Sequence, residues 1–482
     1  MRVREATTTA MGVAGGGRTE AIMREIARLR AQRDELDSRI RFFESQLRVG
    51  AAPATLPPSL STKLDAMGLH AAARGGSGLS PDAVRRYSRQ LLLPDFGVQG
   101  QRRLSRSSVL VVGAGGLGSA VALYLTACGV GSLGVVDGDD VELGNLHRQV
   151  IHVEAYVGQP KVKSAAAACR AMNSSVNVLE HHLKLKSKNA LDVVRQYDIV
   201  VDATNSPASR YMLSDCCVLL NKPLISGSTI GLEGQLMVYN HNGSPCYRCH
   251  FPNPTTTCQT ASSANYTLGV VPGVNGCLQA LETIKVATRV GEPLCGRMLL
   301  FDALSSRFKT VNKIHKRSST CTVCGDNPDL TQDSFVTFDY DSLTQSTKSS
   351  KPMAIQTPLP KSARTSCREY KRVVDSGRTH LLLDVRPVHH FQIASIANSV
   401  NIPLHELRER LPRLRDALTE VAGVSHSHGK HYCPLYFVCQ NGDDSEAAVG
   451  VLRESGFPYA GAIAGGLECW AREVDPGFPV YW

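Results

Sequence analysis

The feature that most constrains the fold is a glycine-rich turn that joins an apolar run to a helical pattern. Residues 109–112 are Val-Leu-Val-Val, which indicates a buried parallel strand, and the glycines after them follow G-x-G-x-x-G. Small residues at such a turn let the backbone approach phosphate groups, and the next helix begins with N–H groups that point at them. We therefore predict a phosphate-binding strand–turn–helix unit. Its glycines are Gly113, Gly115 and Gly118.

Further apolar runs at residues 133–136, 199–201 and 224–225 alternate with helical patterns, which predicts an α/β region with a parallel sheet. Asp137 follows the first of these runs, where a carboxylate can bond a ribose hydroxyl. Nicotinamide-dependent dehydrogenases share this combination. A glycine turn can also serve only to pack a helix closely on a sheet. Both alternatives stay open on these residues alone.

The size and composition of the chain exclude several classes of protein. Its 482 residues suggest about three units, and 43% hydrophobic residues exclude a wholly disordered chain. No run of about 18 apolar residues is present, so we expect no membrane span. Residues 1–17 lack the apolar middle of a secretory signal, so we expect a cytoplasmic protein.

The cysteines and the net charge bear on chemistry and partners. Fifteen cysteines, an odd number, disfavour a disulfide scaffold and favour free thiols, metal sites or sulfur chemistry. The net charge of +10 is compatible with an acidic partner, or with tRNA bound by the basic N-terminal segment. A basic N-terminal segment and scattered lysines explain the charge equally well, so we expect no direct binding of nucleic acid.

The chain divides into four predicted regions. Residues 1–80 contain a short coiled-coil helix, residues 81–340 form the first α/β domain, residues 341–365 form a linker rich in Ser, Thr, Lys and Pro, and residues 366–482 form a second α/β domain. The clearest strands of the second domain are residues 381–385 and 436–438. The coiled-coil seam consists of Ile22, Ile26, Leu29, Arg33, Leu36, Ile40, Phe43 and Leu47.

Two C-x-x-C pairs in the first domain predict a metal centre. Cys246 and Cys249 form one pair, and Cys321 and Cys324 form the other. Four thiolates satisfy tetrahedral zinc, and each pair supplies one edge of the tetrahedron. The 71 residues between the pairs exceed a compact zinc ribbon, so redox-active thiols are the alternative.

Two motifs around the glycine turn narrow the fold to one superfamily. Residues 137–149 are Asp-Gly-Asp-Asp-Val-Glu-Leu-Gly-Asn-Leu-His-Arg-Gln, and residues 86–94 are Arg-Tyr-Ser-Arg-Gln-Leu-Leu-Leu-Pro. In combination these motifs resemble the ubiquitin-activating superfamily over residues 81–327. The resemblance is to the ThiF/MoeB-type enzymes, which adenylate ubiquitin-like sulfur carriers for thiamine and molybdopterin.

That resemblance implies a Rossmann-like activating domain with zinc knuckles, which uses ATP, Mg²⁺ and structural Zn²⁺. Attack of a carboxylate on the α-phosphate brings two anions together, so cationic groups and a metal ion are needed to offset the charge. The matching positions are Gly115 and Gly116 beside the nucleotide, Asp137 on its ribose, Asn145, Arg148 and Lys161 along the triphosphate, and Arg89, which would reach ATP across the interface of a homodimer.

One position departs from the superfamily pattern. The superfamily has an aspartate–asparagine pair after the next buried strand, and its aspartate contacts the metal ion. Here the spacing between Asp202 and Arg210 is kept, but Asn205 and Ser206 occupy the two slots. An amide oxygen can ligate a cation but brings no charge. We expect slower adenylation, rescue by Asp202, or loss of adenylation.

Cys258 follows the first C-x-x-C pair in a loop that resembles the crossover loop of activating enzymes. A thiol there could attack the acyl-adenylate or resolve a disulfide. The alternative is a loop thiol without a chemical role. Cys277 lies in an apolar helical context and is expected in the core.

The second α/β domain places a cysteine between a strand and a helix. Residues 436–438 lead into Cys439-Gln-Asn-Gly-Asp-Asp-Ser445, where backbone N–H groups can stabilise a thiolate or persulfide anion. With Asp384-Val-Arg386 upstream, this pattern resembles a rhodanese domain. A phosphatase would need arginine at position 445, which is serine. The acidic Asp443 and Asp444 disfavour small anionic sulfur donors.

The order of coil, activating domain, linker and rhodanese domain resembles the eukaryotic adenylyltransferase and sulfurtransferase family, also called the molybdenum cofactor synthesis protein 3 family. That resemblance implies adenylation of a sulfur carrier, then transfer of persulfide sulfur from Cys439 to give a thiocarboxylate, with Cys258 assisting release. A cysteine desulfurase would supply the sulfur. The products would serve tRNA wobble-uridine thiolation and molybdopterin synthesis. The alternative is a carrier-binding scaffold in which Asn205 has removed adenylation but sulfur transfer remains.

Overall fold

The computed structural model describes residues 78–252, 254, 266–312, 316–345, 359–423, 433–479 and 481, with the backbone alone at 344, 345, 361 and 417–423. Six residues between 25 and 36 are also described, and all are helical. Among the predicted seam positions these include Leu29 and Leu36; the other six lie outside the described residues, so the coiled coil stays a prediction. Chain contacts define two units, Met1–Leu79 and Ser80–Trp482.

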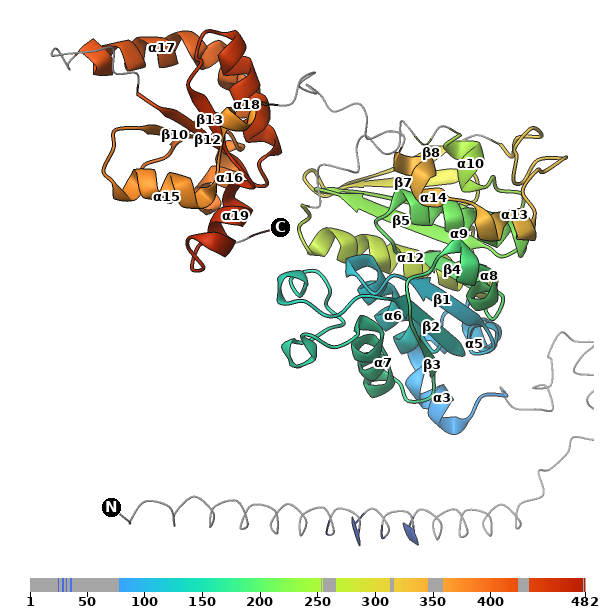
Figure 1. Cartoon of the computed structure of the whole chain (residues 1–482). Helices are drawn as coiled ribbons and strands as arrows, with labels where there is room; N and C mark the ends of the chain where they lie inside the picture. Colours follow the sequence, from blue (N-terminus) through green and yellow to red (C-terminus); the bar gives the residue numbers. More distant parts are fainter. Residues whose placement is uncertain are drawn as a thin grey trace, which may run out of the picture. The chain divides into compact units, whose positions relative to one another are not determined.

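The first α/β domain is built on an eight-stranded mixed sheet with the order β3-β2-β1-β4-β5-β6-β7-β8 (Figure 1). Strands β1 to β5 run parallel, and β5 to β8 pair antiparallel. The strands are β1 Ser108–Val112, β2 Ser132–Asp137, β3 Asn177–His182, β4 Ile199–Asp202, β5 Leu224–Ile230, β6 Glu233–Tyr239, β7 Arg297–Asp302 and β8 Arg307–Asn312.

Helices cover both faces of this sheet and bury two apolar cores. One core lies under α6, α7 and α12, and the other lies under α8, α9, α13 and α14. These helices are α6 Gly116–Cys128, α7 Lys161–Met172, α12 Val270–Thr288, α8 Ser187–Val194, α9 Pro207–Leu219, α13 Gln332–Thr337 and α14 Tyr340–Gln345. The short α3 Pro81–Arg86, α4 Ser88–Leu91 and α5 Gly97–Leu104 precede β1, and α10 Tyr247–His250 follows β6.

The strand order reverses at β1, because β2 lies on one side of it and β4 on the other. In open α/β sheets ligands bind beyond the carboxyl ends of the strands at such a switch point. The glycine turn lies there. Gly113 has φ +100°, and a Cβ on it would lie 2.8 Å from the carbonyl oxygen of Ala203, so only glycine fits.

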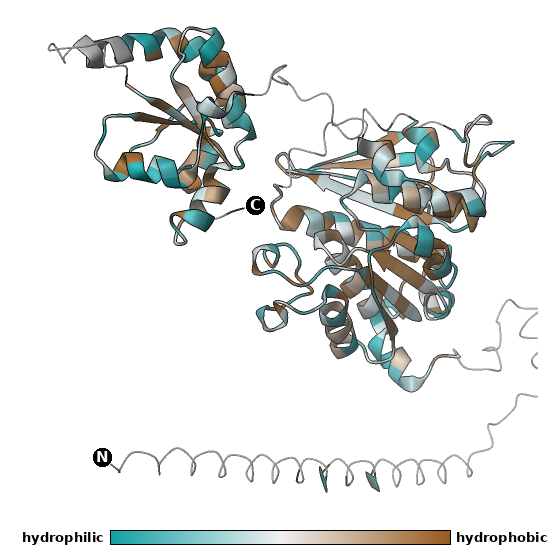
Figure 2. Cartoon of the chain, in the orientation of Figure 1, coloured by the Kyte–Doolittle hydropathy of each residue, from teal (hydrophilic) through white to brown (hydrophobic). Residues whose placement is uncertain are grey.

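The second α/β domain is a five-stranded parallel sheet with the order β11-β10-β12-β13-β9. Figure 2 shows apolar strands between helices whose outer faces are mainly hydrophilic. Strand β9 lies inside the predicted linker, so the second sheet includes residues before 366. Its elements are β9 Arg364–Thr365, β10 Leu381–Asp384, β11 Val400–Asn401, β12 Leu435–Val438, β13 Ala460–Ile463, α15 Cys367–Asp375, α16 Val388–Ile393, α17 Leu407–Gly423, α18 Asp443–Glu454 and α19 Gly466–Glu473.

None of the helices in the described part of the chain combines the length and apolarity that crossing a membrane requires.

Candidate active sites and metal centre

A cavity at the carboxyl ends of β1, β2 and β4 brings together most of the predicted nucleotide-binding residues. Gly118 lies beneath this cavity, since a Cβ on it would overlap the carbonyl oxygen of Gly113 at 1.8 Å. Arg89 is exposed and does not line the cavity of its own chain. The predicted residues that line the cavity are Gly113, Gly115, Gly116, Asp137, Asn145, Arg148, Lys161 and Asn205.

The Asp137 carboxylate holds the glycine turn in place. Its Oδ2 accepts a hydrogen bond from the N–H of Ala114 at 2.8 Å, and its Oδ1 accepts one from the N–H of Asp139 at 2.9 Å. Each carboxylate oxygen retains acceptor capacity for a hydroxyl group. The residue therefore orients the turn and still faces the cavity.

Two cationic side chains reach the cavity from separate segments. Lys161 is the first residue of α7; its side chain is 8% exposed, and its Nζ lies 3.6 Å from Oδ2 of Asp139. Arg148 donates to Oδ1 of Asn145, whose Nδ2 donates to Glu142 at 2.6 Å. Burial lowers the pKa of Arg148, and Glu142 opposes that effect. The pair supplies positive charge where a triphosphate would need it.

Asn205 is exposed to the cavity, just before α9. The neighbouring Ser206 is the N-cap of α9, and its Oγ accepts from the N–H of Ser209 at 3.4 Å. The expectation that Asp202 could replace a missing carboxylate is wrong. Asp202 is fully buried, and its carboxylate accepts hydrogen bonds from the backbone and hydroxyl of Thr204 and from the hydroxyl of Ser226.

The sequence also led to predictions for two further cysteines of this domain, Cys258 and Cys277. Cys258 lies outside the described residues, so its position is not assigned. Cys277 is partly exposed, contrary to the expected core position, because it lies on a side of α12 that neighbouring elements only partly cover.

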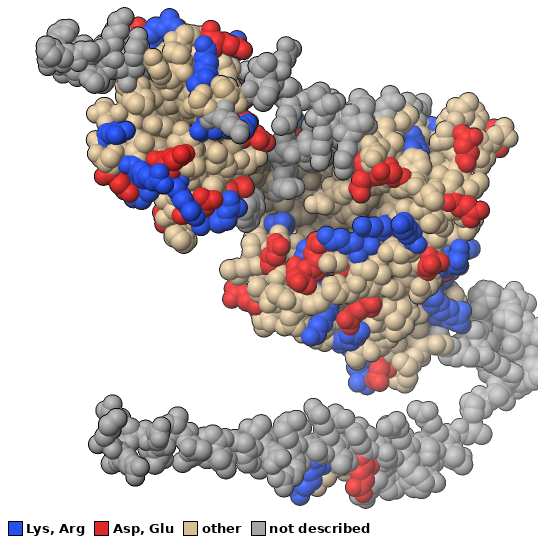
Figure 3. Space-filling model, viewed as in Figure 1, with Lys and Arg blue, Asp and Glu red and all other residues tan. Residues whose placement is uncertain are grey.

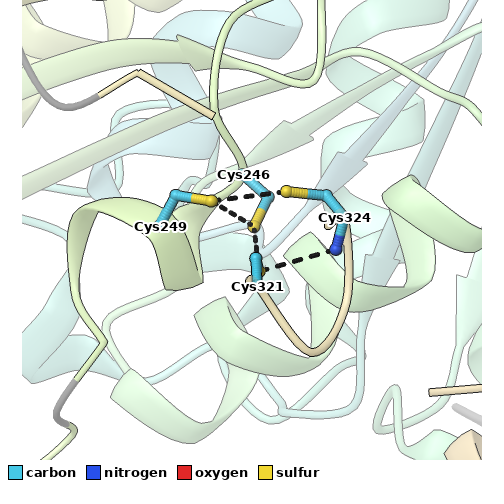
Figure 4. A group of neighbouring side chains, drawn as sticks. All are labelled: Cys246, Cys249, Cys321 and Cys324. Carbon is cyan, nitrogen blue, oxygen red and sulfur yellow. Dashed lines mark hydrogen bonds between the residues drawn. The ribbon is translucent and has the colours of Figure 1, made fainter. Parts of the chain in front are cut away.

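The two C-x-x-C pairs converge on one point (Figure 4). Sγ of Cys246 lies 3.8 Å from that of Cys249 and 3.7 Å from that of Cys321, and Cys249 and Cys324 lie 3.3 Å apart. All four sulfurs lie within 4.8 Å of one another. Zinc–sulfur bonds of ~2.3 Å give a tetrahedron with edges of about 3.8 Å, so the four thiols fit zinc.

A buried ion pair, which the sequence reading did not identify, connects the first knuckle to the sheet-covering helices. Arg248 lies between Cys246 and Cys249 and donates from Nε and Nη2 to the carboxylate of Asp215 on α9, at 2.9 and 2.7 Å. The hydroxyl of Tyr340 donates to the same carboxylate at 2.7 Å. The ion pair therefore ties the first C-x-x-C pair to α9, the helix that begins beside Asn205.

Cys439 follows β12 directly, and its sulfur lies in the turn that begins α18. Its Sγ accepts from the N–H groups of Gly442 at 3.1 Å and Ser445 at 3.3 Å. Gly442, the N-cap, has φ +104°, a conformation that suits glycine. Cys439 is only 1% exposed. Burial raises the pKa of its thiol, and the hydrogen bonds from Ser445 and Gly442 lower it. The effect of burial is the larger, so the thiolate is less stabilised than the sequence predicted.

The Asp384-Val-Arg386 motif is structural. The guanidinium of Arg386 is 2% exposed and donates to both carboxylate oxygens of Asp384, at 2.9 and 2.6 Å. It also donates to the hydroxyl of Tyr481. Trp470 is buried and contacts Tyr370, so it is a core residue of this domain. These contacts support the sheet that carries Cys439.

Comparison with known proteins assigns both domains. Residues 87–323 match the ThiF family, and residues 366–473 match the rhodanese-like domain. "Adenylyltransferase and sulfurtransferase MOCS3" of Oryza sativa subsp. japonica is 59% identical over 97% of this chain and 98% of its own length. The Arabidopsis thaliana protein of that name is 52% identical over 97% of this chain and 100% of its own.

The mouse protein of the same name is 44% identical over 84% of this chain and 89% of its own. A ThiF-family domain implies use of ATP, and the MOCS3 relatives carry both activities in their name. Since the relatives align along almost the whole chain, the chain belongs to the adenylyltransferase and sulfurtransferase MOCS3 family and is an enzyme with both activities.

Proposed function

We propose that this enzyme adenylates the C-terminal glycine of a ubiquitin-like sulfur carrier and then converts the adenylate to a thiocarboxylate with sulfur from Cys439. The observation that carries the proposal is the presence of two anion-stabilising sites of different kinds in one chain. One is the cavity with Arg148 and Lys161, and the other is the N–H-lined turn around Cys439.

In the first step a carboxylate oxygen of the carrier attacks the α-phosphate of ATP, and pyrophosphate leaves. Lys161 and Arg148 offset the charge that gathers as two anions meet. Gly115 leaves the cavity wall open, because a Cβ there would have its nearest neighbour at 4.0 Å. Asp137 faces the ribose, and Arg89 from a second subunit completes the site in a homodimer.

Mg²⁺ would be held by the phosphates together with the amide oxygen of Asn205. Asn205 is exposed to the cavity and suited to cation ligation, but it is neutral. Asp202 cannot contribute, since its carboxylate is buried and hydrogen-bonded. The metal site is therefore weaker than one with an aspartate. Adenylation is retained in this proposal, in agreement with the activity of the family.

In the second step the terminal sulfur of a Cys439 persulfide attacks the acyl-adenylate, and AMP leaves. The product is an acyl disulfide between the carrier and Cys439. A second thiol then attacks the Cys439 sulfur, releases the carrier thiocarboxylate and forms a disulfide with Cys439. We assign this role to Cys258, and an external thiol must then reduce the disulfide. A cysteine desulfurase supplies the persulfide sulfur. The buried sulfur of Cys439 lies beside the acidic Asp443 and Asp444, which repel small anionic sulfur donors, and this supports a protein as the donor.

We further propose that the carrier serves tRNA wobble-uridine thiolation and molybdopterin synthesis, in the cytoplasm. Direct binding of tRNA is not part of this proposal. On the face shown in Figure 3, basic side chains form a short row with acidic side chains close by. Such mixed charge is less favourable for a phosphate backbone than an uninterrupted basic surface.

Carrier-dependent exchange of pyrophosphate into ATP tests the adenylation step. We expect exchange with the wild type, and a roughly threefold to tenfold lower half-saturating Mg²⁺ concentration for Asn205→Asp, because a carboxylate adds charge to the metal site. Asn205→Ala is the control and should need more Mg²⁺ than the wild type. Absence of exchange in the wild type, with Cys439 still loaded by the desulfurase, would establish the scaffold alternative instead.

A further inference from the structure

His152 is a buried histidine beside the adenylation cavity that has no role in the chemistry described above. Its side chain is 5% exposed. Nε2 lies 3.0 Å from the carbonyl oxygen of Ala114, and Nδ1 lies 3.0 Å from Oγ of Ser164. A carbonyl can only accept, so Nε2 carries the proton and Nδ1 accepts from the serine hydroxyl. Burial lowers the pKa of His152, which keeps the ring neutral.

The two partners of His152 belong to the two parts of the cavity that a nucleotide would join. Ala114 is the residue between Gly113 and Gly115, and its N–H is already held by Asp137. Ser164 is on α7, one turn after Lys161 and on the same side of the helix. The ring thus connects the glycine turn to the helix that presents the lysine.

Asp139 adds a second connection between the same parts. Its N–H donates to Asp137, its carbonyl accepts from the N–H of Lys161 at 3.0 Å, and its carboxylate lies 3.6 Å from Nζ of Lys161. The backbone of the glycine turn and the start of α7 are therefore fixed at two places. Of these two connections, the ring of His152 is the one that contacts the glycine turn itself, through the carbonyl oxygen of Ala114.

We propose that His152 is a positioning residue for ATP, which fixes the glycine turn relative to Lys161 through its contacts with Ala114 and Ser164. The inference rests on the proposed ATP site. Misplacement of binding groups by about 1 Å costs on the order of a hundredfold in rate in well-ordered active sites, so a small shift of the turn is enough to weaken binding.

Two substitutions separate the contacts of the ring. The amide of glutamine reaches the position of Nε2, so His152→Gln can still donate to Ala114. The shorter asparagine reaches only the position of Nδ1, so His152→Asn can contact Ser164 but leaves the carbonyl of Ala114 without its donor. Ser164→Ala, the matched third variant, removes the hydroxyl and leaves the histidine in place.

The measurement is calorimetric binding of ATP with Mg²⁺ to the full chain, without carrier. We expect the Kd to rise about tenfold for His152→Asn and about threefold or less for His152→Gln and Ser164→Ala. The KM for ATP in the exchange assay should rise with the Kd, while kcat stays within about twofold. A merely structural role would lower kcat and the zinc content together.

A double-mutant cycle with Lys161→Ala tests the coupling. Because His152 acts by placing the turn relative to Lys161, the two substitutions together should weaken ATP binding less than the product of their separate effects. Zinc content reports whether the first domain is folded in each variant. If His152→Asn loses zinc, its ATP affinity no longer reports on the position of the turn. The Ser164→Ala variant and its cycle with Lys161→Ala then provide the test of the inference.

An unchanged Kd in His152→Asn with full zinc content, or strict additivity in the cycle, would overturn the inference. Failure of the wild type itself to bind ATP would instead overturn the proposed ATP site.

Discussion

In the proposed function, the adenylation cavity and the Cys439 turn both stabilise negative charge, but with different groups. The cavity offers the side chains of Arg148 and Lys161, which come from separate segments of the first domain. The Cys439 turn uses backbone N–H groups of residues 442 and 445, around a sulfur with almost no exposure. Side chains can be removed one at a time, whereas backbone donors remain under any non-proline substitution. Activity at the first site should therefore fall with each cationic side chain that is removed. Activity at the second site should depend on the sulfur of Cys439 and on the charges near it.

The largest expected effect on adenylation comes from removing a cation from the cavity. Lys161→Ala should slow carrier-dependent ATP–pyrophosphate exchange by about a hundredfold, because the charge on the phosphates is left without its buried partner. Persulfide loading of Cys439 should be unchanged, since it occurs in the other domain. Lys163→Ala, at an exposed position on the same helix, is the control and should exchange normally. Exchange within threefold of the wild type in Lys161→Ala would show that the lysine is not part of the site.

A smaller effect is expected from the ion pair that braces the metal centre. Arg248→Ala leaves the carboxylate of Asp215 buried without its guanidinium, which should destabilise the first domain by about 3–5 kcal/mol. Zinc should then be released at lower denaturant concentration, while the rhodanese-like domain unfolds as before.

Arg195→Ala is the matched comparison for that substitution. Its partner Asp192 lies 3.8 Å away, and both side chains are more than half exposed, so its loss should cost no more than about 1 kcal/mol. Equal denaturant dependence of zinc release in the two variants would contradict the bracing role of Arg248.

The smallest effect concerns the charge beside Cys439. The carboxylate of Asp444 raises the pKa of the Cys439 thiol, in addition to the larger effect of burial. Asp444→Asn removes that charge and lowers the pKa, so more thiolate is present at any pH below it. Alkylation of Cys439, followed by mass spectrometry of its peptide, should become about twofold faster at neutral pH, and its pH profile should shift to lower pH. Asp416→Asn, at an exposed position on α17, should leave the profile where it is; a slower reaction in Asp444→Asn would contradict the sign.

Local patterns predicted the parts of the fold that are themselves local. The runs at 109–112, 133–136, 199–201 and 224–225 are all strands, because continuous apolar residues suit a sheet covered on both faces. The antiparallel half of the sheet was not predicted. Strand β8 is mostly exposed and carries polar residues, so its sequence has no apolar signal. Strand β3 lies at the sheet edge and has the same property.

The candidate sites show a similar limit. The spacing of the four cysteines and the glycine turn indicated groups that meet in space, but the state of Asp202 depends on Ser226, which lies 24 residues away. The partners of His152 lie 12 and 38 residues away, so no local pattern identifies it. For Cys439 the turn was predictable, but the depth of burial that raises its pKa was not. Contacts between distant segments account for these differences.

The most direct test of two separable sites uses Cys439→Ala. Wild type, Cys439→Ala and the control Cys433→Ala are each incubated with carrier, ATP, Mg²⁺, cysteine and a cysteine desulfurase, and the carrier is analysed by mass spectrometry. We expect thiocarboxylate with the wild type and with Cys433→Ala, and none with Cys439→Ala, while ATP–pyrophosphate exchange is the same in all three. Undiminished thiocarboxylate from Cys439→Ala, or loss of exchange in that variant, would contradict the account.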